Sequence, residues 1–438
     1  MKLTLAMIVR NEEAHLGHCL ASVRGLVDEI VVVDTGSTDG TVALAREGGA
    51  KVIPWAWTED FSAARNESLA HATGDWVLVL DADEAIDPRD HALIRSACAQ
   101  AGVDAYRMLI RSYLPDGAYT MMDLPARPNP GGYGEGSAYA HCGETRAVRL
   151  FRRAPWVRFH CRVHEQVDPC FLERGLPMPD LDAVIHHYGF TLARRTEAKK
   201  PVYLAMARRD AEDRPGDLQS RFHLLIQAAA AEDWALASAT AEEYRAAAEA
   251  RGLPAPPSVL LTQAVALQRQ GAHAQAVRTF QELLDVDPDS VPGAVGLGVS
   301  LERLGRVPEA RRILETCVRD QPGYLTAYLD LADLQVRAGA PALARTVLEA
   351  GLGVAPGDPA LHARRIRLGL EAGDPGQAVR DAWDAIRACP GGGAGDWHTL
   401  VGLFLLRQGA GEEGRQVLAQ GLERFPDHPE LIRLMGLC

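Results

Sequence analysis

The chain has 438 residues, of which 47% are hydrophobic and 24% are charged, and its formal net charge is −12. A chain of this length is too long for one ordinary domain, so we expect two or three. The excess of acidic residues argues against a general binder of nucleic acids or anionic membranes, because contacts to phosphate need surplus Lys and Arg.

The N-terminal part alternates predicted strands with predicted helices. Apolar, β-branched runs bounded by polar turns indicate strands, and helical patterns separate them. The strands are expected at 3–9, 29–35 and 76–80, and the helices at about 12–26, 41–48 and 61–72. This alternation predicts a parallel sheet with right-handed crossovers.

Polar residues follow each of the three predicted strands. Asn11 and Glu12 come after the first, Asp34 ends the second, and Asp81 and Asp83 follow the third. Ligands bind at the carboxyl ends of parallel strands, so these residues predict a site at one edge of the sheet. Carboxylates placed there repel one another unless a cation lies among them, and hard oxygen ligands suit Mg²⁺ or Mn²⁺.

The pair of aspartates alone is a weak motif with other interpretations. The acids could instead cap the following helix, whose pattern begins near Pro88. A phosphatase of the haloacid-dehalogenase type also uses an Asp-x-Asp pair, but after its first strand and with Thr or Val two residues later. Here the pair follows a later strand and Ala85 occupies that place, which disfavours the phosphatase.

Several segments between 112 and 190 add candidate site residues. Residues 112–146 are rich in Gly, Pro and Tyr and predict a mobile loop or hairpin over the site. RFHCRVHEQV (158–167) and IHHYGF (185–190) contribute histidines and a glutamate. Zinc is disfavoured because the residues that could bind it lack paired spacing. These residues are His141, Cys142, Cys161 and Cys170.

The C-terminal part repeats with a period of 34 residues, stretched to 36 in the last interval. Each unit has a glycine at a turn, a small residue five positions later, and a proline that ends the second helical pattern. This pattern resembles the tetratricopeptide repeat, a helix-turn-helix unit that stacks into a solenoid. The markers are Gly271, Gly305, Gly339, Gly373 and Gly409; Ala276, Ala310, Ala344, Ala378 and Gly414; and Pro288, Pro322, Pro356, Pro390 and Pro426.

The N-terminal segments LTLAMIVRNEEAHLGHCLASV, DEIVVVDTGSTDGT and DFSAARNESLAHATGDWVLVLDADE together resemble glycosyltransferase family 2. The resemblance is close over 3–84 and loose from 85 to about 190. It implies an α/β GT-A (Rossmann-like) catalytic domain, followed by the all-α repeat solenoid. We expect the catalytic domain at 1–195, a helical linker with a degenerate repeat at 196–256, and about five repeats at 257–438.

The resemblance implies which residues bind the nucleotide. Val9, Asn11 and Glu12 are expected to hold the base and ribose, and Asp34 to contact the uracil or ribose. Arg65, with Asn66 beside it, and Asp81 are expected at the diphosphate or the base. The alternative for Arg65 is a place on a solvated helix face.

The resemblance also implies a metal site and a catalytic base. Asp83 and Asp81 are expected to bind Mn²⁺ or Mg²⁺. His187 is the third expected ligand, with His186 as its rival, because IHHYGF is similar to a segment of the peptide S-glycosyltransferases. Glu165 is the candidate base and His164 its neighbour in the catalytic set, although either could only order a loop.

The sequence thus predicts an inverting, metal-dependent hexosyltransferase that uses a nucleotide-sugar donor, with UDP as the expected nucleotide. A protein or peptide acceptor would dock in the repeat groove and be O-glycosylated by default; flagellin or another surface protein is a reasonable target. The alternatives are S-linked transfer, a glycan or lipid-linked sugar acceptor with repeats for dimerisation, and a non-catalytic repeat scaffold. No apolar run approaches the ~18 residues of a membrane span. That absence and the lack of a CxxC pair predict a cytoplasmic protein. The Ala- and Arg-rich composition suggests a bacterium, and the solenoid ends and Cys438 leave a homodimer open.

Overall fold

The computed structural model describes residues 1–114, 127–189, 193–389 and 392–436. It divides into two compact units, Met1–Pro254 and Ala255–Cys438, each with its own apolar core. Part of the loop predicted at 112–146, namely 115–126, lies outside the described residues, as do Phe190 and Pro390.

The first unit is built on a mixed sheet in the strand order β3-β2-β1-β4-β8-β6-β9-β5, with β7 paired to β8. The first four strands of this order are parallel, as predicted, whereas β8 runs antiparallel to both β4 and β6. The strands are β1 (Leu3–Val9), β2 (Glu29–Asp34), β3 (Lys51–Pro54), β4 (Trp76–Val79), β5 (Glu84–Ile86), β6 (Ala105–Leu114), β7 (Arg127–Pro128), β8 (His141–Arg152) and β9 (Asp180–His187).

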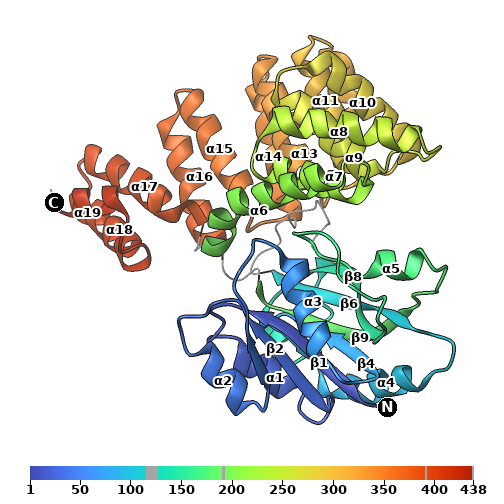
Figure 1. Ribbon diagram of the computed structural model, residues 1–438. Helices are drawn as coiled ribbons and strands as arrows, with labels where there is room; N and C mark the ends of the chain where they lie inside the picture. Colours follow the sequence, from blue (N-terminus) through green and yellow to red (C-terminus); the bar gives the residue numbers. More distant parts are fainter. Residues whose placement is uncertain (115–126, 190–192, 390–391, 437–438) are drawn as a thin grey trace. The chain divides into compact units, whose positions relative to one another are not determined.

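Apolar layers cover both faces of the sheet. Side chains alternate along β1, so Leu5 and Met7 belong to one core cluster and Ala6 to the other. The first cluster includes side chains from α1, α2 and α4, and the second includes side chains from α3 and α5 (Figure 1). The helices are α1 (Leu16–Ser22), α2 (Thr41–Glu47), α3 (Phe61–His71), α4 (His91–Ala99) and α5 (Asp168–Leu172).

Three further helices belong to the first unit: α6 (Ala193–Asp213), α7 (Leu218–Ala230) and α8 (Trp234–Glu249). Helices α7 and α8 lie within 196–256, where the sequence predicts a helical linker with a degenerate repeat. Met206 of α6 and Leu224 of α7 share a buried cluster with Val163. The segment expected as a linker is therefore packed onto the sheet domain.

The second unit is a row of antiparallel helix pairs (Figure 1). All five predicted turn glycines have a left-handed backbone, with φ between 72° and 83°, which is why glycine occupies these turns. The pairs are α9 (Pro257–Arg269) and α10 (His273–Val286), α11 (Val291–Arg303) and α12 (Val307–Asp320), α13 (Leu325–Arg337) and α14 (Pro341–Val354), α15 (Pro359–Glu371) and α16 (Pro375–Ala388), and α17 (Asp396–Arg407) and α18 (Gly411–Arg424), followed by α19 (Pro429–Met435). No helix in the described part of the chain combines the length and apolarity needed to cross a bilayer.

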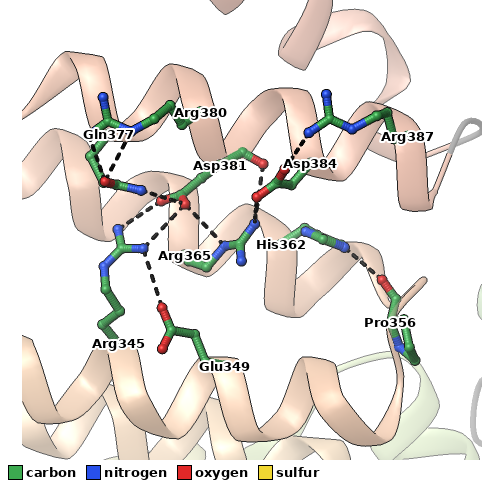
Figure 2. Close-up of polar contacts among 10 residues, drawn as sticks. All are labelled: Arg345, Glu349, Pro356, His362, Arg365, Gln377, Arg380, Asp381, Asp384 and Arg387. Carbon is green, nitrogen blue, oxygen red and sulfur yellow. Dashed lines mark hydrogen bonds and ion pairs between the residues drawn. The ribbon is translucent and has the colours of Figure 1, made fainter.

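A buried carboxylate joins three consecutive helices of this row (Figure 2). Asp381 of α16 is only 2% exposed. Its oxygens accept hydrogen bonds from Arg345 of α14 (2.7 Å) and Gln377 (3.0 Å), and Arg365 of α15 lies 3.3 Å away. Because two guanidinium groups face one carboxylate, the network fixes how adjacent repeats pack.

Candidate active site

The loops after β1 and β2 meet at the carboxyl edge of the sheet. Val9 ends β1 and pairs with Asp34 at the end of β2. The side-chain oxygen of Asn11 accepts the Thr38 N–H at 2.7 Å, and Asn11 itself has a φ of 55°, a conformation that Asn tolerates. The predicted nucleotide residues Val9, Asn11, Glu12 and Asp34 therefore lie at one edge.

Asp34 is buried and its carboxylate is held by its own turn. The backbone N–H groups of Gly36 and Ser37 donate to its oxygens at 3.2–3.3 Å. Its backbone oxygen accepts the Trp55 N–H at 2.8 Å. These bonds fix the orientation of a carboxylate that can accept hydrogen bonds from a ribose hydroxyl or a base N–H.

The residues after β4 form a tight turn that separates the acids. The Asp81 N–H donates to Glu84 Oε2 at 2.8 Å, and the Glu84 N–H returns to the Asp81 carbonyl at 3.1 Å. Glu84 is 2% exposed, whereas the side chains of Asp81 and Asp83 are 39% and 25% exposed. Glu84, which the sequence analysis did not single out, thus closes the turn that presents both aspartates.

Two arginines compensate the carboxylates around this turn. Arg65 of α3 donates to Asp81 and, through Nε, to Glu165 at 3.0 Å. Arg149 of β8 donates to Glu84 at 3.0 Å and to Asp81 at 3.4 Å. Burial alone would raise the pKa of Asp81, but Arg65 and Arg149 hold it well below its usual range. Burial raises the pKa of Glu84, and Arg149 offsets part of that shift.

Arg65 is buried, with 3% exposure, so the alternative of a solvated helix face does not hold. Its Nη1 is buried and has no hydrogen-bond partner among the described residues. A buried guanidinium N–H without a partner is unfavourable unless a ligand accepts a hydrogen bond from it. An anionic group such as a diphosphate is the natural acceptor for that donor.

Asp83 and His187 form the second half of the site. His187 Nε2 lies 3.7 Å from Asp83 Oδ2, and Ser112 shares a hydrogen bond with Nδ1 at 2.9 Å. Strand pairing sets this geometry, because His187 lies opposite Glu84 on β5 and Ser112 on β6. Burial would lower the pKa of His187, but Asp83 and the neighbouring carboxylates raise it above its usual value.

The donor set around His187 fits a divalent cation. Carboxylate oxygens and an imidazole nitrogen suit Mn²⁺ or Mg²⁺, and the Ser112 contact orients the ring as outer-shell partners do. Gly189 makes room for the pair: a Cβ there would lie 2.5 Å from both Asp83 Oδ2 and His187 Nε2. Asp81 lies two residues before Asp83 and is the remaining candidate ligand.

His186, the rival of His187, faces an aromatic layer. Its Nδ1 is 2.6 Å from the Tyr113 hydroxyl, and its ring stacks on Tyr133 with 3.5 Å between centroids. Burial lowers the pKa of His186 to about 4. These contacts indicate a packed, neutral histidine.

The segment 158–167 places Glu165 and His164 in different surroundings. Glu165 is ion-paired to Arg65 and so lies within the carboxylate–arginine cluster. His164 is 2.7 Å from the Gln227 side chain of α7. The side-chain oxygen of Asn66 accepts the Phe159 N–H at 2.7 Å, and its amide nitrogen donates to the Phe159 carbonyl at 3.0 Å. These two hydrogen bonds hold α3 against this segment.

Helix α6 also reaches the site, beyond the boundary expected at residue 195. The Tyr203 ring packs edge-on against Phe61, with 5.7 Å between centroids. Burial and the charges of Glu165, Asp81 and Asp83 raise the pKa of Tyr203 to about 12. No sequence pattern points to Tyr203, because only the packing of α6 brings it near the carboxylates.

Comparison with known proteins agrees with this architecture. The Glycosyl transferase family 2 model matches residues 4–123, and two tetratricopeptide repeat models match 261–324 and 309–365. The first match contains the β1, β2 and β4 edge, Arg65, Asp81 and Asp83. The second and third contain three of the five glycine turns, at Gly271, Gly305 and Gly339.

Two curated relatives and one solved structure resemble parts of the chain. A TPR repeat-containing protein of Synechococcus elongatus is 38% identical over 195 residues, which are 43% of this chain and 42% of the relative. The SPbeta prophage-derived glycosyltransferase SunS of Bacillus subtilis is 28% identical over 191 residues, or 43% of this chain and 40% of SunS. The chain thus spans about two fifths of these relatives' length. The C-terminal part of a TPR repeat-containing protein from Cytophaga hutchinsonii is 14% identical, covering 55% of this chain and 98% of that chain with a TM-score of 0.40.

Proposed function

Because the chain carries a glycosyltransferase family 2 domain followed by tetratricopeptide repeats, we propose that it is an inverting, metal-dependent glycosyltransferase. It moves a sugar from a nucleotide donor, with UDP as the nucleotide, onto a protein or peptide. The observation that supports this most is the Asp83–His187 pair next to the arginine-bound Asp81 at the carboxyl edge of the sheet.

The donor nucleotide is proposed to bind along this edge. Val9, Asn11, Glu12 and Asp34 would hold the base and ribose, because polar groups there are already oriented by backbone bonds. Arg65 would donate its unpartnered Nη1 to the diphosphate. Asn66, predicted beside the diphosphate, contributes by holding α3 against Phe159.

Asp83, His187 and Asp81 would hold Mn²⁺ or Mg²⁺. A divalent ion bound there supplies positive charge that stabilises the departing nucleoside diphosphate. Arg65 and Arg149 lower the pKa of Asp81, so its carboxyl group is ionised, which is the form that can bind a cation.

Glu165 is proposed as the base. In an inverting transfer a carboxylate takes the proton of the acceptor nucleophile as that nucleophile attacks the anomeric carbon. The Arg65 Nε contact holds one oxygen of Glu165 in place, which leaves the other for the acceptor. His164, which contacts Gln227, would support the same segment from the side of α7.

The repeats support a polypeptide acceptor, because stacked helix pairs present long surfaces for binding extended chains. Transfer to a Ser, Thr or Tyr hydroxyl of flagellin or another surface protein is the default, and S-linked transfer to Cys is the variant. A cytoplasmic location is supported by the free cysteines of the described residues. A homodimer through the repeats stays a prediction.

The proposal is tested by incubating the purified chain with Mn²⁺ and a panel of nucleotide sugars and measuring free nucleotide. Release from one donor is expected, with loss on chelation and in Asp83→Ala. Asp182→Ala is the matched control, because Asp182 is a 90% exposed carboxylate on β9 outside the cluster. Where no donor alone reacts, candidate acceptor proteins are added; nucleotide release that stays equal in Asp83→Ala and the parent would refute the metal assignment.

A further inference from the structure

A second cluster of metal-binding side chains lies outside the site described above. Cys161 lies in the segment 158–167, Asp210 is on α6 and His223 is on α7. All three are buried. One ligand atom of each lies within 4.8 Å of the other two, so a common centre is no more than about 2.8 Å from any of them, close to the ~2.0–2.3 Å of zinc bonds.

Each of these side chains is oriented by a neighbour, and Asp210 and His223 each keep one further atom for another partner. Arg214 is ion-paired to Asp210 Oδ1 and also contacts the Cys161 thiol. The amide nitrogen of Gln219 lies 2.8 Å from His223 Nε2; with the amide turned over, its oxygen accepts the Nε2 proton and Nδ1 is left free to bind a metal. Asp210 Oδ2 and His223 Nδ1 are buried and have no hydrogen-bond partner among the described residues. Metal ligands are typically held in this way by a second group on their far atom.

We propose that Cys161, Asp210 and His223 bind a zinc ion. A thiolate, an imidazole and a carboxylate together select zinc over Mg²⁺ or Mn²⁺, which prefer oxygen ligands alone. Binding replaces the thiol proton of Cys161 with a sulfur–zinc bond and releases that proton to solvent. Three protein ligands leave a fourth position for a water molecule. Arg214 then donates to the bound thiolate and carboxylate as their outer partner.

The ion would join the catalytic segment to the helices that follow it. Cys161 and His164 have left-handed backbones, with φ of 74° and 56°, so this segment needs outside contacts to keep its shape. Glu165 follows at once. If the proposed function holds, zinc would therefore position the base, although the zinc site itself stands without that function.

The test is metal analysis of the full chain purified without a histidine tag. About one zinc per chain is expected, together with a near-ultraviolet thiolate-to-metal band after Co²⁺ substitution. Cys161→Ser should abolish the band, whereas Cys98→Ser, which replaces a buried cysteine of α4, should leave it unchanged. Gln219→Leu removes no ligand and should weaken zinc binding about 10–100-fold.

These outcomes separate the proposal from its alternatives. No zinc and no cobalt band in the parent chain, or a band that survives in Cys161→Ser, would overturn it and leave the cluster bridged by water. If Cys161→Ser fails to fold, Gln219→Leu still decides, because unchanged affinity in that variant contradicts the assigned His223 ligand. Asp83→Ala should keep its zinc whether or not it loses transferase activity, so failure of the two proposals can be told apart.

Discussion

Gly189→Ala should disable the proposed donor site while leaving the fold intact. The new Cβ would lie 2.5 Å from Asp83 Oδ2 and from His187 Nε2. A carbon atom makes a favourable van der Waals contact from about 3.5 Å, so Asp83 Oδ2 and His187 Nε2 must both move away by about 1 Å. That shift exceeds the tolerance of about 0.2 Å for metal–ligand bonds. Because both neighbours are the ends of flexible side chains, they can move without unfolding the chain.

Misplacement by about 1 Å lowers activity by about 10²-fold, which is ~2.7 kcal/mol of transition-state stabilisation. The assay is kcat/KM for nucleotide release at several Mn²⁺ concentrations, beside the melting temperature. Gly17→Ala is the matched control, because a Cβ on that α1 glycine meets nothing within 4 Å. Activity and Mn²⁺ dependence equal to the parent in Gly189→Ala would show that Asp83 and His187 do not share a metal.

Three further perturbations probe other parts of the structure. Asp381→Ala leaves two partly buried arginines without their buried carboxylate and should destabilise the repeats by about 3 kcal/mol in denaturant unfolding. Removing the half-exposed carboxylate in Asp384→Ala should change little; equal effects would contradict the network. Burial and Asp333 raise the pKa of Asp330 to about 6. The stability that the protonated Asp330 carboxyl contributes is therefore lost as pH rises from about 4 to 6. Asp330→Asn should accordingly raise the melting temperature at pH 7.5 but not at pH 4. Arg65→Lys keeps the charge but loses the forked donors, so nucleotide affinity measured by calorimetry should fall at least about tenfold, and an unchanged affinity would remove Arg65 from the diphosphate.

Local patterns in the sequence predicted the elements that local physics determines. The run at 3–9 is β1 to the residue, because its alternating apolar side chains fill two core layers. The glycine spacing predicted the repeat turns, since only glycine adopts their backbone without strain. Family resemblance predicts Asp83, Arg65 and His187 as site residues, and the structure brings Arg65 to Asp81 and His187 to Asp83.

The partners that depend on long-range packing could not be predicted. Arg149 lies beside the negative charges of Asp81 and Glu84 only because β8 pairs with β4. No periodic pattern in the sequence predicts that pairing. Tyr203 reaches the carboxylates because α6 packs back onto the first unit. The sequence places Cys161 near other cysteines, whereas its neighbours in space come from α6 and α7.

Asp81, Asp83 and His187 are proposed to form the metal–nucleotide site of a sugar transferase. Crystals grown with Mn²⁺ and UDP and measured at the manganese absorption edge test this directly. One anomalous manganese peak is expected between Asp83 and His187, with diphosphate density reaching Arg65 and the base near Asp34. A manganese peak elsewhere, or UDP bound away from the β1–β2–β4 edge, would contradict it.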